Sequence, residues 1–565
     1  MRSLTLCAMR SVGIKRGLKR GYLAFMILVV VLSSNTRRSL KAGTDEGVPA
    51  AVGDLDPTFG TGGKVVTDFG GEFDRATTVG VQPDGKIVAG GFTLSSNNFA
   101  LARYNVDGGL DSSFGSGGKV TTDFDVSSNS GIAAIAIQAD GKVIAAGGVQ
   151  PRSDISPTLP NFKFAMTRYN PDGSLDQSFG SGGKVVTDFT GSSESVSALV
   201  IQPDRKILAA GFVDNPARTN RDFALARYNP DGSLDSSFGF GGKVITDFGG
   251  VFDGANAIAI QPGARILVAG SNHSLSTVSS FSLVRYNVDG SIDSSFGSGG
   301  KVTTRFSDNA GVRALALQPD SKIVAAGTAD DGKAGSDFAL ARYNPDGSLD
   351  LSFGCQGKVT TDFGTYNAAY AMSIQSDGKI VVAGGVQQGT DSRSSDFVLA
   401  RYNPDGGLDS SFGSGGKVIT DFSGGSDTAF ALTIQPDHNI VLAGQGETNT
   451  NFDFALARYV TERDFALSID PAIVNATRPT KVRLSVRIHR FGGFSGAVVI
   501  IPPETSSLNI KMVPDSFSTP GEKAVFKLKI RENAPSGPQM LVFTAKDDTG
   551  RVHTATVTLV IEGER

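Results

Sequence analysis

The chain has 565 residues, a formal net charge of −3 at pH 7 and a composition that is 39% hydrophobic. This length exceeds what one ordinary hydrophobic core supports, so we expect more than one domain. The nearly balanced charge excludes the basic field that nucleic-acid binding requires, and no nucleic-acid partner is expected.

Several basic residues at the N-terminus precede an apolar run at residues 22–32. This order is typical of an export signal, because about 11 apolar residues are too few to cross a bilayer as an ordinary helix. We interpret residues 1–34 as a signal peptide and 35–53 as a linker. An uncleaved signal anchor is the alternative, because no A-x-A cleavage pattern follows closely. The protein is therefore expected to be secreted or at the cell surface, with no membrane span in the mature chain.

One sequence unit recurs seven times between residues 54 and 460 and is clearest at 226–248, ARYNPDGSLDSSFGFGGKVITDF. Units of this length are too short to bury a core alone, so neighbouring copies must pack on each other. The first copy has four strand-like runs, at 64–69, 77–82, 86–90 and 99–105, and its QPDGK segment is typical of a tight hairpin. We therefore predict an all-β fold, a seven-bladed β-propeller of four-stranded blades, which closes into a ring and removes exposed sheet edges.

The connections between these runs fall into two kinds. The RY tyrosine and the following FG phenylalanine are 10 residues apart in all six complete cases, and the hairpin after each QPDGK glutamine also has constant length. The gap between the third and fourth runs, in contrast, varies from 9 to 17 residues. Because alternate connections of an antiparallel sheet emerge on opposite faces, we predict one constant, structural face and one variable face.

The longest variable connections are residues 149–161, 213–221 and 386–395. We expect them to share one face of the ring and to contact a protein or polysaccharide partner. The candidate binding residues are Gln150, Arg152, Asp154, Asn215, Arg218, Asp391 and Arg393.

The repeats resemble the delta-60 repeat family of bacterial exported proteins, through the recurring segments LDxSFGxGGKVxTDF, QPDGKI and FALARYNPDG. The resemblance covers residues 55–459, about 70% of the chain. It implies a β-propeller of unknown activity and supplies no catalytic residue. Departures such as Arg305, which replaces the aspartate of a TDF segment, argue against a site that needs seven identical copies.

The NPDG loops offer oxygen atoms that suit calcium, for example from Asn229, Asp231 and Asp235. They lack two features of an EF-hand calcium loop, a third oxygen ligand near its start and a bidentate glutamate at its end. The alternative is an Asx-type turn with glycine in the left-handed conformation. We expect turns, no cofactor and no change of thermal stability on adding chelator, with calcium kept as the less favoured interpretation.

An arginine precedes the tyrosine of every RY pair and falls in a row of apolar side chains on its strand. A buried guanidinium needs a carboxylate partner, and aspartates equivalent to Asp111 or Asp123 are available in each copy. We predict structural ion pairs, with anion binding as the alternative. The arginines are Arg103, Arg168, Arg227, Arg285, Arg342, Arg401 and Arg458.

After residue 460 the repeat ends, and residues 461–565 contain short alternating strands between proline and glycine turns. This pattern predicts an immunoglobulin-like β-sandwich. The segments DFALSIDPAIV, FGGFSGAVVI, ENAPSGPQMLVFTA and HTATVTLVI are similar to bacterial immunoglobulin-like domains appended to exported proteins. We expect this domain to act as a spacer or surface tether.

Residues 54–460 should close on themselves, because the array starts with a GKVVTDF segment that has no preceding copy and its last copy lacks one. The run 64–69 can complete the last sheet. We predict that Val65 and Thr67 pair in antiparallel register with the strand containing Leu456 and Arg458.

No catalytic constellation is evident, because the four histidines are single and scattered: His273, His438, His489 and His553. We therefore expect an exported, non-enzymatic monomer that presents its variable face to a ligand. Two alternatives stay open: a propeller enzyme, a lyase or hydrolase acting at the ring mouth, and a purely structural surface protein.

Overall fold

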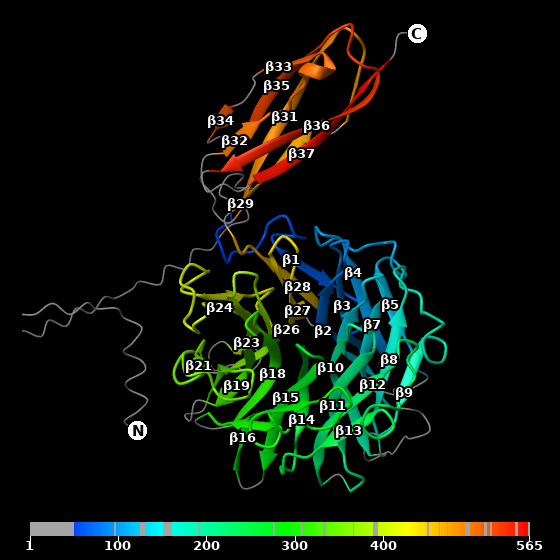
Figure 1. Cartoon of the computed structure of the whole chain (residues 1–565), viewed down its shortest axis with the longest axis vertical. Helices are drawn as coiled ribbons and strands as arrows, with labels where there is room; N and C mark the ends of the chain where they lie inside the picture. The colour runs from blue at the N-terminus through cyan, green and yellow to red at the C-terminus, as the bar shows by residue number, and fades with distance from the viewer. Residues whose placement is uncertain are drawn as a thin grey trace, which may run out of the picture. The chain divides into compact units, whose positions relative to one another are not determined.

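The structure is a computed structural model, shown in Figure 1. It describes residues 50–94, 98–124, 130–150, 161–189, 192–217, 219–274, 277–306, 309–330, 335–364, 366–387, 394–448, 451–462, 464–471, 473–491, 498–513, 517–519, 523–547 and 552–562. Among these residues no helix has the length and apolar character needed to cross a membrane.

The first complete sheet shows how one copy of the repeat folds. Its strands β2 (Asp74–Val81), β3 (Ile87–Thr93), β4 (Asn98–Tyr104) and β5 (Lys119–Thr122) are antiparallel and hydrogen bonded in the order β2-β3-β4-β5. Strands β3 and β4 are almost wholly buried, which fits their continuous apolar sequences. Strand β5 comes from the GKV segment of the next copy, so each sheet is offset from the sequence repeat by one strand.

Five further sheets follow the same plan. Their strands are β6 (Gly131–Ile137), β7 (Val143–Val149), β8 (Lys163–Tyr169) and β9 (Lys184–Thr187); β10 (Ser193–Ile201), β11 (Ile207–Asp214), β12 (Arg221–Tyr228) and β13 (Lys243–Thr246); β14 (Gly254–Gln261), β15 (Arg265–Ser274), β16 (Thr277–Tyr286) and β17 (Lys301–Thr304); β18 (Ala310–Leu317), β19 (Ile323–Asp330), β20 (Ser336–Tyr343) and β21 (Lys358–Thr361); and β22 (Asn367–Ile374), β23 (Ile380–Gln387), β24 (Ser395–Tyr402) and β25 (Lys417–Thr420).

The last sheet of this region is built from both of its ends. It contains β26 (Thr428–Ile434), β27 (Ile440–Thr448), β28 (Asn451–Tyr459) and, beside β28, the first strand β1 (Lys64–Thr67). β1 is antiparallel to β28 and places Val65 opposite Leu456, which confirms the predicted closing pair.

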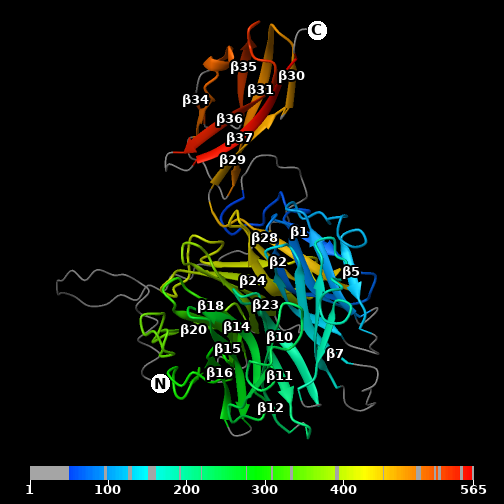
Figure 2. The same ribbon diagram turned by 45° about the vertical axis from the view of Figure 1, so that its right-hand side comes forward.

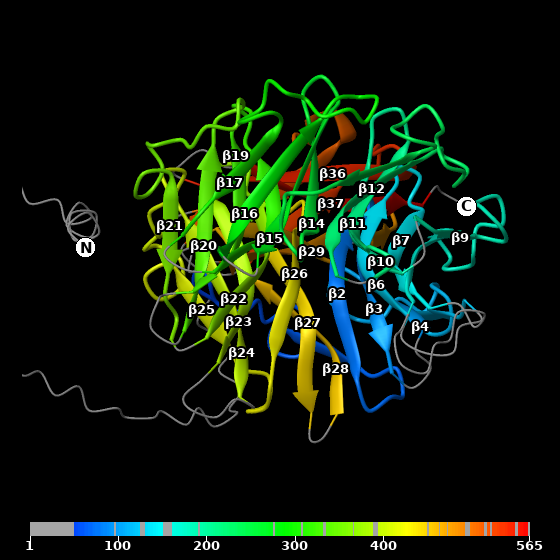
Figure 3. The same ribbon diagram turned by 90° about the horizontal axis from the view of Figure 1, so that it is seen from below.

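The first strands of successive sheets form a closed ring. β2 packs against β6, and the series continues through β10, β14, β18, β22 and β26, which packs against β2 again. Figure 3 shows these strands toward the middle of the ring and strands such as β9 and β21 at its outside, and Figure 2 shows β14 between β18 and β10. Each hydrophobic core lies between two neighbouring sheets, as where Leu267 and Phe281 of one sheet meet Val312 and Ala325 of the next.

A buried hydrogen bond joins each sheet to the sheet before it. The hydroxyl of Tyr104 in β4 donates to Thr67 Oγ1 of β1 at 2.9 Å. The same contact recurs in the other sheets, as Tyr169–Thr122, Tyr228–Thr187, Tyr286–Thr246, Tyr343–Thr304, Tyr402–Thr361 and Tyr459–Thr420. Burial raises the pKa of Tyr169 to about 12, so its hydroxyl remains a donor at neutral pH.

The C-terminal part consists of two sheets that share one core. The strands are β29 (Asp464–Asp470), β30 (Ile473–Ala476), β31 (Thr480–Phe491), β32 (Val498–Ile501), β33 (Ile510–Val513), β34 (Phe517–Thr519), β35 (Lys523–Ile530), β36 (Gly537–Asp547) and β37 (Val552–Ile561), with a 3-10 turn η2 (Ser506–Leu508). The first sheet has the order β29-β31-β35-β33 and the second β30-β37-β36-β32-β34. The rings of Phe526 and Phe543, one from each sheet, lie 5.0 Å apart in the core.

Removal of residues 54–69 should destabilise the ring more than removal of residues 463–565. The N-terminal deletion exposes the edge of β28, removes the fully buried Phe59 and takes Asp56 away from the buried Arg458. We expect Tm to fall further for this deletion in a thermal melt of the two truncated proteins. Equal melting temperatures for the N-terminal deletion and the intact chain would contradict closure by β1.

Candidate functional site

The two ends of the ring differ in how constant their sequences are. Antiparallel pairing brings the β2–β3 turn at residues 82–86 and the β4–β5 connection at 105–118 to one end of the sheet. We call this end, in every sheet, the fixed end. The connections from β3 to β4 and from β5 to the next sheet leave at the opposite end, the variable end. This arrangement confirms the predicted segregation of constant and variable connections.

At the fixed end the arginine of each RY pair lies against an aspartate. In the third complete sheet, Asp235 Oδ2 accepts hydrogen bonds from Arg227 Nε at 2.7 Å and from Lys206 Nζ at 2.8 Å, and Asp235 Oδ1 accepts from Ser237. The Arg227 guanidinium lies 4.4 Å from the centroid of the Phe238 ring. The carboxylate and the ring thus compensate the desolvation of a buried cation.

Each of the seven arginines forms this pair. The pairs are Arg103–Asp111, Arg168–Asp176, Arg227–Asp235, Arg285–Asp293, Arg342–Asp350, Arg401–Asp409 and Arg458–Asp56. Arg103 also donates to the backbone oxygen of Pro171 in the next sheet. Arg103 therefore connects the β4–β5 loop with the equivalent β8–β9 loop of the next sheet.

The NPDG loops are turns. Asn229 N donates to Ser233 O at 2.8 Å, Asp231 Oδ1 accepts from Ser233 N and Oγ, and Gly232 has φ +88°. Of the proposed calcium ligands, Asp235 already holds Arg227 and Lys206. Asp231 Oδ1 and both carboxylate oxygens of Asp235 are thus engaged within the turn and the ion pair.

The candidate binding residues at the variable end have different surroundings. Gln150 is only 4% exposed, because it directly follows the buried strand β7. Asn215 Oδ1 accepts from Thr219 N at 2.9 Å and caps the turn after β11. The remaining candidates, Arg152, Asp154, Arg218, Asp391 and Arg393, lie outside the described residues.

Two aromatic side chains at the variable end are half exposed. Phe252, between β13 and β14, has 48% of its surface exposed, and Tyr366, between β21 and β22, has 51%. Each residue forms a parallel bridge with the strand that leads into the RY pair, Phe252 with Arg221 and Tyr366 with Ser336. Exposed rings held by backbone pairing suit contacts with a ligand.

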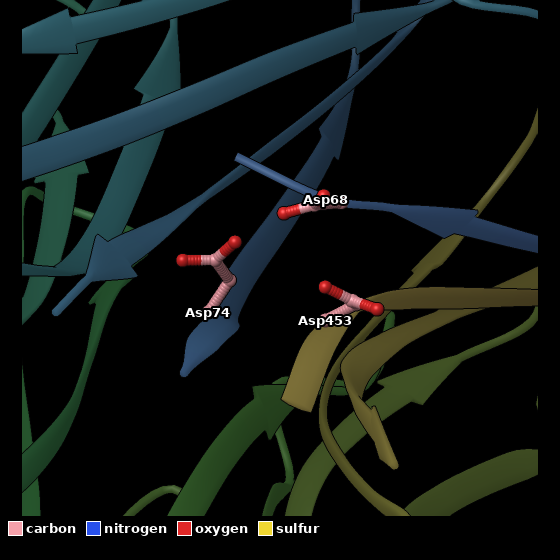
Figure 4. Close-up of side chains that lie close together, drawn as sticks. All are labelled: Asp68, Asp74 and Asp453. Carbon is pink, nitrogen blue, oxygen red and sulfur yellow. The ribbon is translucent and has the colours of Figure 1, made fainter. Parts of the chain in front are cut away.

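Groups of three carboxylates also lie at the variable end, where one sheet meets the next. One oxygen from each member lies within 4.8 Å of the others in each group, which we call a junction cluster. A cluster combines the residue before the phenylalanine of the RY strand, the aspartate of TDF and the residue at the start of the next sheet. The three clusters are Asp453, Asp68 and Asp74, drawn in Figure 4; Asp222, Asp247 and Asp253; and Asp396, Asp421 and Asp427.

In each junction cluster the carboxyl group at the start of the next sheet is desolvated and is repelled by neighbouring aspartates. Burial, and then the Asp68 and Asp453 charges, raise the pKa of Asp74. Burial and the Asp247 charge likewise raise the pKa of Asp253. Burial raises the pKa of Asp427 to about 6, and nearby aspartate charges add to this effect.

The sequence interpretation missed the junction clusters, although each member was visible. Asp68 and Asp74 stand six residues apart across a turn, but Asp453 comes from the far end of the array. One feature of the sequence could have indicated the clusters. An aspartate, for example Asp222, precedes the phenylalanine of FALARY in some copies only.

The described histidines do not form a hydrolase triad. His273 Nδ1 lies 2.7 Å from Ser279 Oγ, and His438 Nδ1 lies 3.1 Å from Glu462 Oε1 in another part of the ring. Within the described residues no carboxylate hydrogen bonds to the second ring nitrogen of His273, so the group that orients the base of a triad is missing there. The side chains of His489 and His553 lie outside the described residues.

Replacement of Asp235 by alanine should destabilise the ring, because Arg227 then stays buried without its carboxylate. We expect the free energy of unfolding to fall by about 3 kcal/mol in urea denaturation. The matched control is Asp204→Ala, which removes an exposed carboxylate from the hairpin of the same sheet and should change stability by about 0.5 kcal/mol or less. An equally small loss for both variants would show that the ion pair is not a structural element.

Stability should also fall in acid because of these aspartates. Burial alone would raise the pKa of Asp409, but hydrogen bonds from Ser411 and the charges of Arg401 and Lys379 outweigh it and lower the pKa to about 2. A group whose pKa is lower in the folded state contributes stability above its unfolded value, near 4, and loses it as pH falls toward 2. Melts between pH 2 and 6 should show this loss, with a smaller slope for Asp409→Asn.

Comparison with known proteins supports the repeat architecture. A family described as a domain of unknown function (DUF5122) beta-propeller matches residues 82–114, 138–179, 202–238, 265–296, 318–353 and 375–412. No curated protein matches the chain. Among solved structures, domains 4 and 5 of the S-layer protein SbsC are 13% identical, with 29% of this chain and 89% of that chain covered and a TM-score of 0.13. The N-terminal four Ig domains of Dscam1 isoform 4.44 are 9% identical, with 74% and 95% covered and a TM-score of 0.14.

At these TM-scores the two structural likenesses carry no argument about the fold. The six family matches instead fall on successive sheets of the ring, each from a hairpin to the FG phenylalanine at the fixed end. The chain is therefore a β-propeller repeat protein.

Proposed function

We propose that the chain is an exported, non-enzymatic β-propeller of seven blades that binds a protein or polysaccharide ligand at its variable end. In this proposal each four-stranded sheet is one blade, as the delta-60 resemblance implies, and residues 461–565 form an immunoglobulin-like spacer. The basic N-terminal segment followed by an apolar run, which is typical of an export signal, supports a location outside the cell.

The contrast between the two ends carries the proposal. At the fixed end seven Arg–Asp pairs repeat one set of contacts and leave little that could distinguish one ligand from another. At the variable end, the positions of the half-exposed Phe252 and Tyr366 do not hold an aromatic residue in every sheet. The polar residues there also differ from junction to junction. Scaffolds with one constant and one variable end commonly use the variable end for recognition.

Aromatic rings favour a carbohydrate or a protein surface with apolar patches. A sugar face stacks on an exposed ring through its C–H groups, and a protein partner buries the same ring in an interface. The test is a screen of the purified chain against a glycan array and a panel of candidate surface proteins.

Substitution of Tyr366 and Phe252 by alanine should weaken binding of a ligand found in this screen by about tenfold or more, because each ring supplies contact area. The rings are half exposed, so Tm should stay close to that of the original chain. The matched control is Phe240→Ala, which removes a ring that is 93% exposed at the fixed end. If the affinity fell with Phe240→Ala and not with the other two variants, the ligand would bind at the fixed end and the proposal would be contradicted.

A further inference from the structure

Two of the three junction clusters contain buried carboxylate oxygens without a hydrogen-bond donor among the described residues. Asp74 is 0% exposed and Asp453 is 5% exposed, and the Oδ1 atom of each has no hydrogen-bond partner among the described residues. The Oδ1 atom of Asp253, in the second cluster, is in the same situation. An unpaired carboxylate in the interior is costly. The first cluster places two buried carboxylates beside an exposed one, and the second places the buried Asp253 beside the half-buried Asp222 and the exposed Asp247.

The other oxygen atoms of the first cluster are held by the protein. Asp74 Oδ2 accepts from Phe69 N at 2.7 Å, Asp68 Oδ1 accepts from Gly70 N at 2.5 Å, and Asp453 Oδ2 accepts from Thr448. These bonds fix the three carboxylates while one oxygen of each remains for a further partner. Figure 4 shows the three groups facing a common space.

The second cluster is built in the same way. Asp253 Oδ2 accepts from Phe248 N at 2.9 Å, and Asp247 Oδ1 accepts from Gly249 N at 2.5 Å. Because these bonds come from a turn with the same spacing, the two clusters are equivalent positions in different sheets.

A different junction of the same ring shows what the carboxylates attract. There Lys163 occupies the position of Asp453 and Asp222, directly before the phenylalanine of the RY strand. Its side-chain ammonium is buried and lies 3.0 Å from Asp188 and 3.9 Å from Glu194, the two remaining acidic residues of that junction. Where the chain provides its own cation, the cation thus lies against the acidic groups of the junction.

Two more junctions lower the negative charge by substitution. Asn367 replaces the third aspartate of one junction, and its Nδ2 lies 3.5 Å from Asp362. At another junction Arg305 replaces the aspartate of TDF and Ser280 precedes the phenylalanine. The clusters that keep all three carboxylates are therefore a distinct class of junction.

We propose that the first two junction clusters, those of Asp74 and Asp253, are binding sites for divalent cations of the calcium type. The third cluster is not included, because Phe422 N and Glu447 N already donate to both oxygens of Asp427. Three carboxylates provide only oxygen ligands at flexible spacing, which suits Ca²⁺ better than ions that prefer nitrogen or sulfur. Asp68 and Asp247 are exposed, so water can complete the coordination from the open side. The proposal goes beyond the recognition function and does not depend on it.

Cation binding at the first cluster has a particular structural effect. Asp453 belongs to β28 and Asp68 follows β1, whereas Asp74 begins β2 in the first complete sheet. An ion at this position links the last sheet to the first one. The expectation that chelator leaves stability unchanged considered the NPDG loops alone, and this proposal predicts the opposite outcome.

Titration of the purified, chelator-treated chain with CaCl₂ alone should show two sites by calorimetry, one at the Asp74 cluster and one at the Asp253 cluster. Tm should rise by several degrees at about 5 mM CaCl₂, above the ~10⁻⁴–10⁻³ M range of weak calcium sites. MgCl₂ at the same concentration is the comparison ion and should have a smaller effect.

Three substitutions and one control make the test specific. Asp453→Asn should reduce two sites to one, and Asp453→Lys should do the same while raising Tm without calcium, because it copies the arrangement at Lys163. Lys163→Asp should add a third site. Asp231→Asn, which changes an NPDG loop at the fixed end, is the matched control and should keep both sites.

Absence of calcium heat and of any change in Tm would overturn the proposal. It would also be overturned if Asp231→Asn lowered the number of sites and Asp453→Asn did not. If the chain bound calcium at these sites but bound none of the screened glycans or proteins, only the proposed recognition function would be contradicted.

Discussion

The structure depends on one constraint, that no sheet of the ring is completed by its own copy of the repeat. Each sheet takes its outer strand from the next copy, and the last sheet takes β1 from the beginning of the array. This offset holds neighbouring copies together by backbone hydrogen bonds, in addition to the apolar cores between the sheets. The Tyr–Thr bond and the Arg–Asp pair then connect the same neighbours through side chains, so cohesion is spread evenly around the ring.

Much of this architecture was predictable because it is local and periodic. Strand runs, the hairpin at QPDGK and the closing pair of Val65 with Leu456 follow from spacing and from the need to remove a sheet edge. The strand bounds were less accurate: β2 begins at Asp74 and not at residue 77, because backbone pairing with β3 extends past the apolar run and through an irregularity near Ala76.

The candidate sites were harder to predict, for a physical reason. Asp68, Asp74 and Asp453 approach one another only after the ring closes, and no spacing rule links the last of them to the first two. Gln150 was assigned to an exposed connection, but the buried pattern of β7 continues one residue further. The two ends also differ in charge. Arginines neutralise the aspartates of the fixed end, whereas three junctions at the variable end each hold three carboxylates.

Closure by β1 has a consequence for how the chain reaches its final state. Asp56 and Arg458 are separated by 402 positions, so the contact between them cannot form until nearly the whole array has been synthesised. Loop closure over such a distance is entropically unfavourable, and topologies rich in distant contacts fold slowly. Between the end of synthesis and the closure of the ring, β28 presents an open edge and β1 is a free strand of matching sequence. Two unfinished molecules can therefore exchange these strands, and a head-to-tail exchange of this kind produces open chains of rings instead of separate ones.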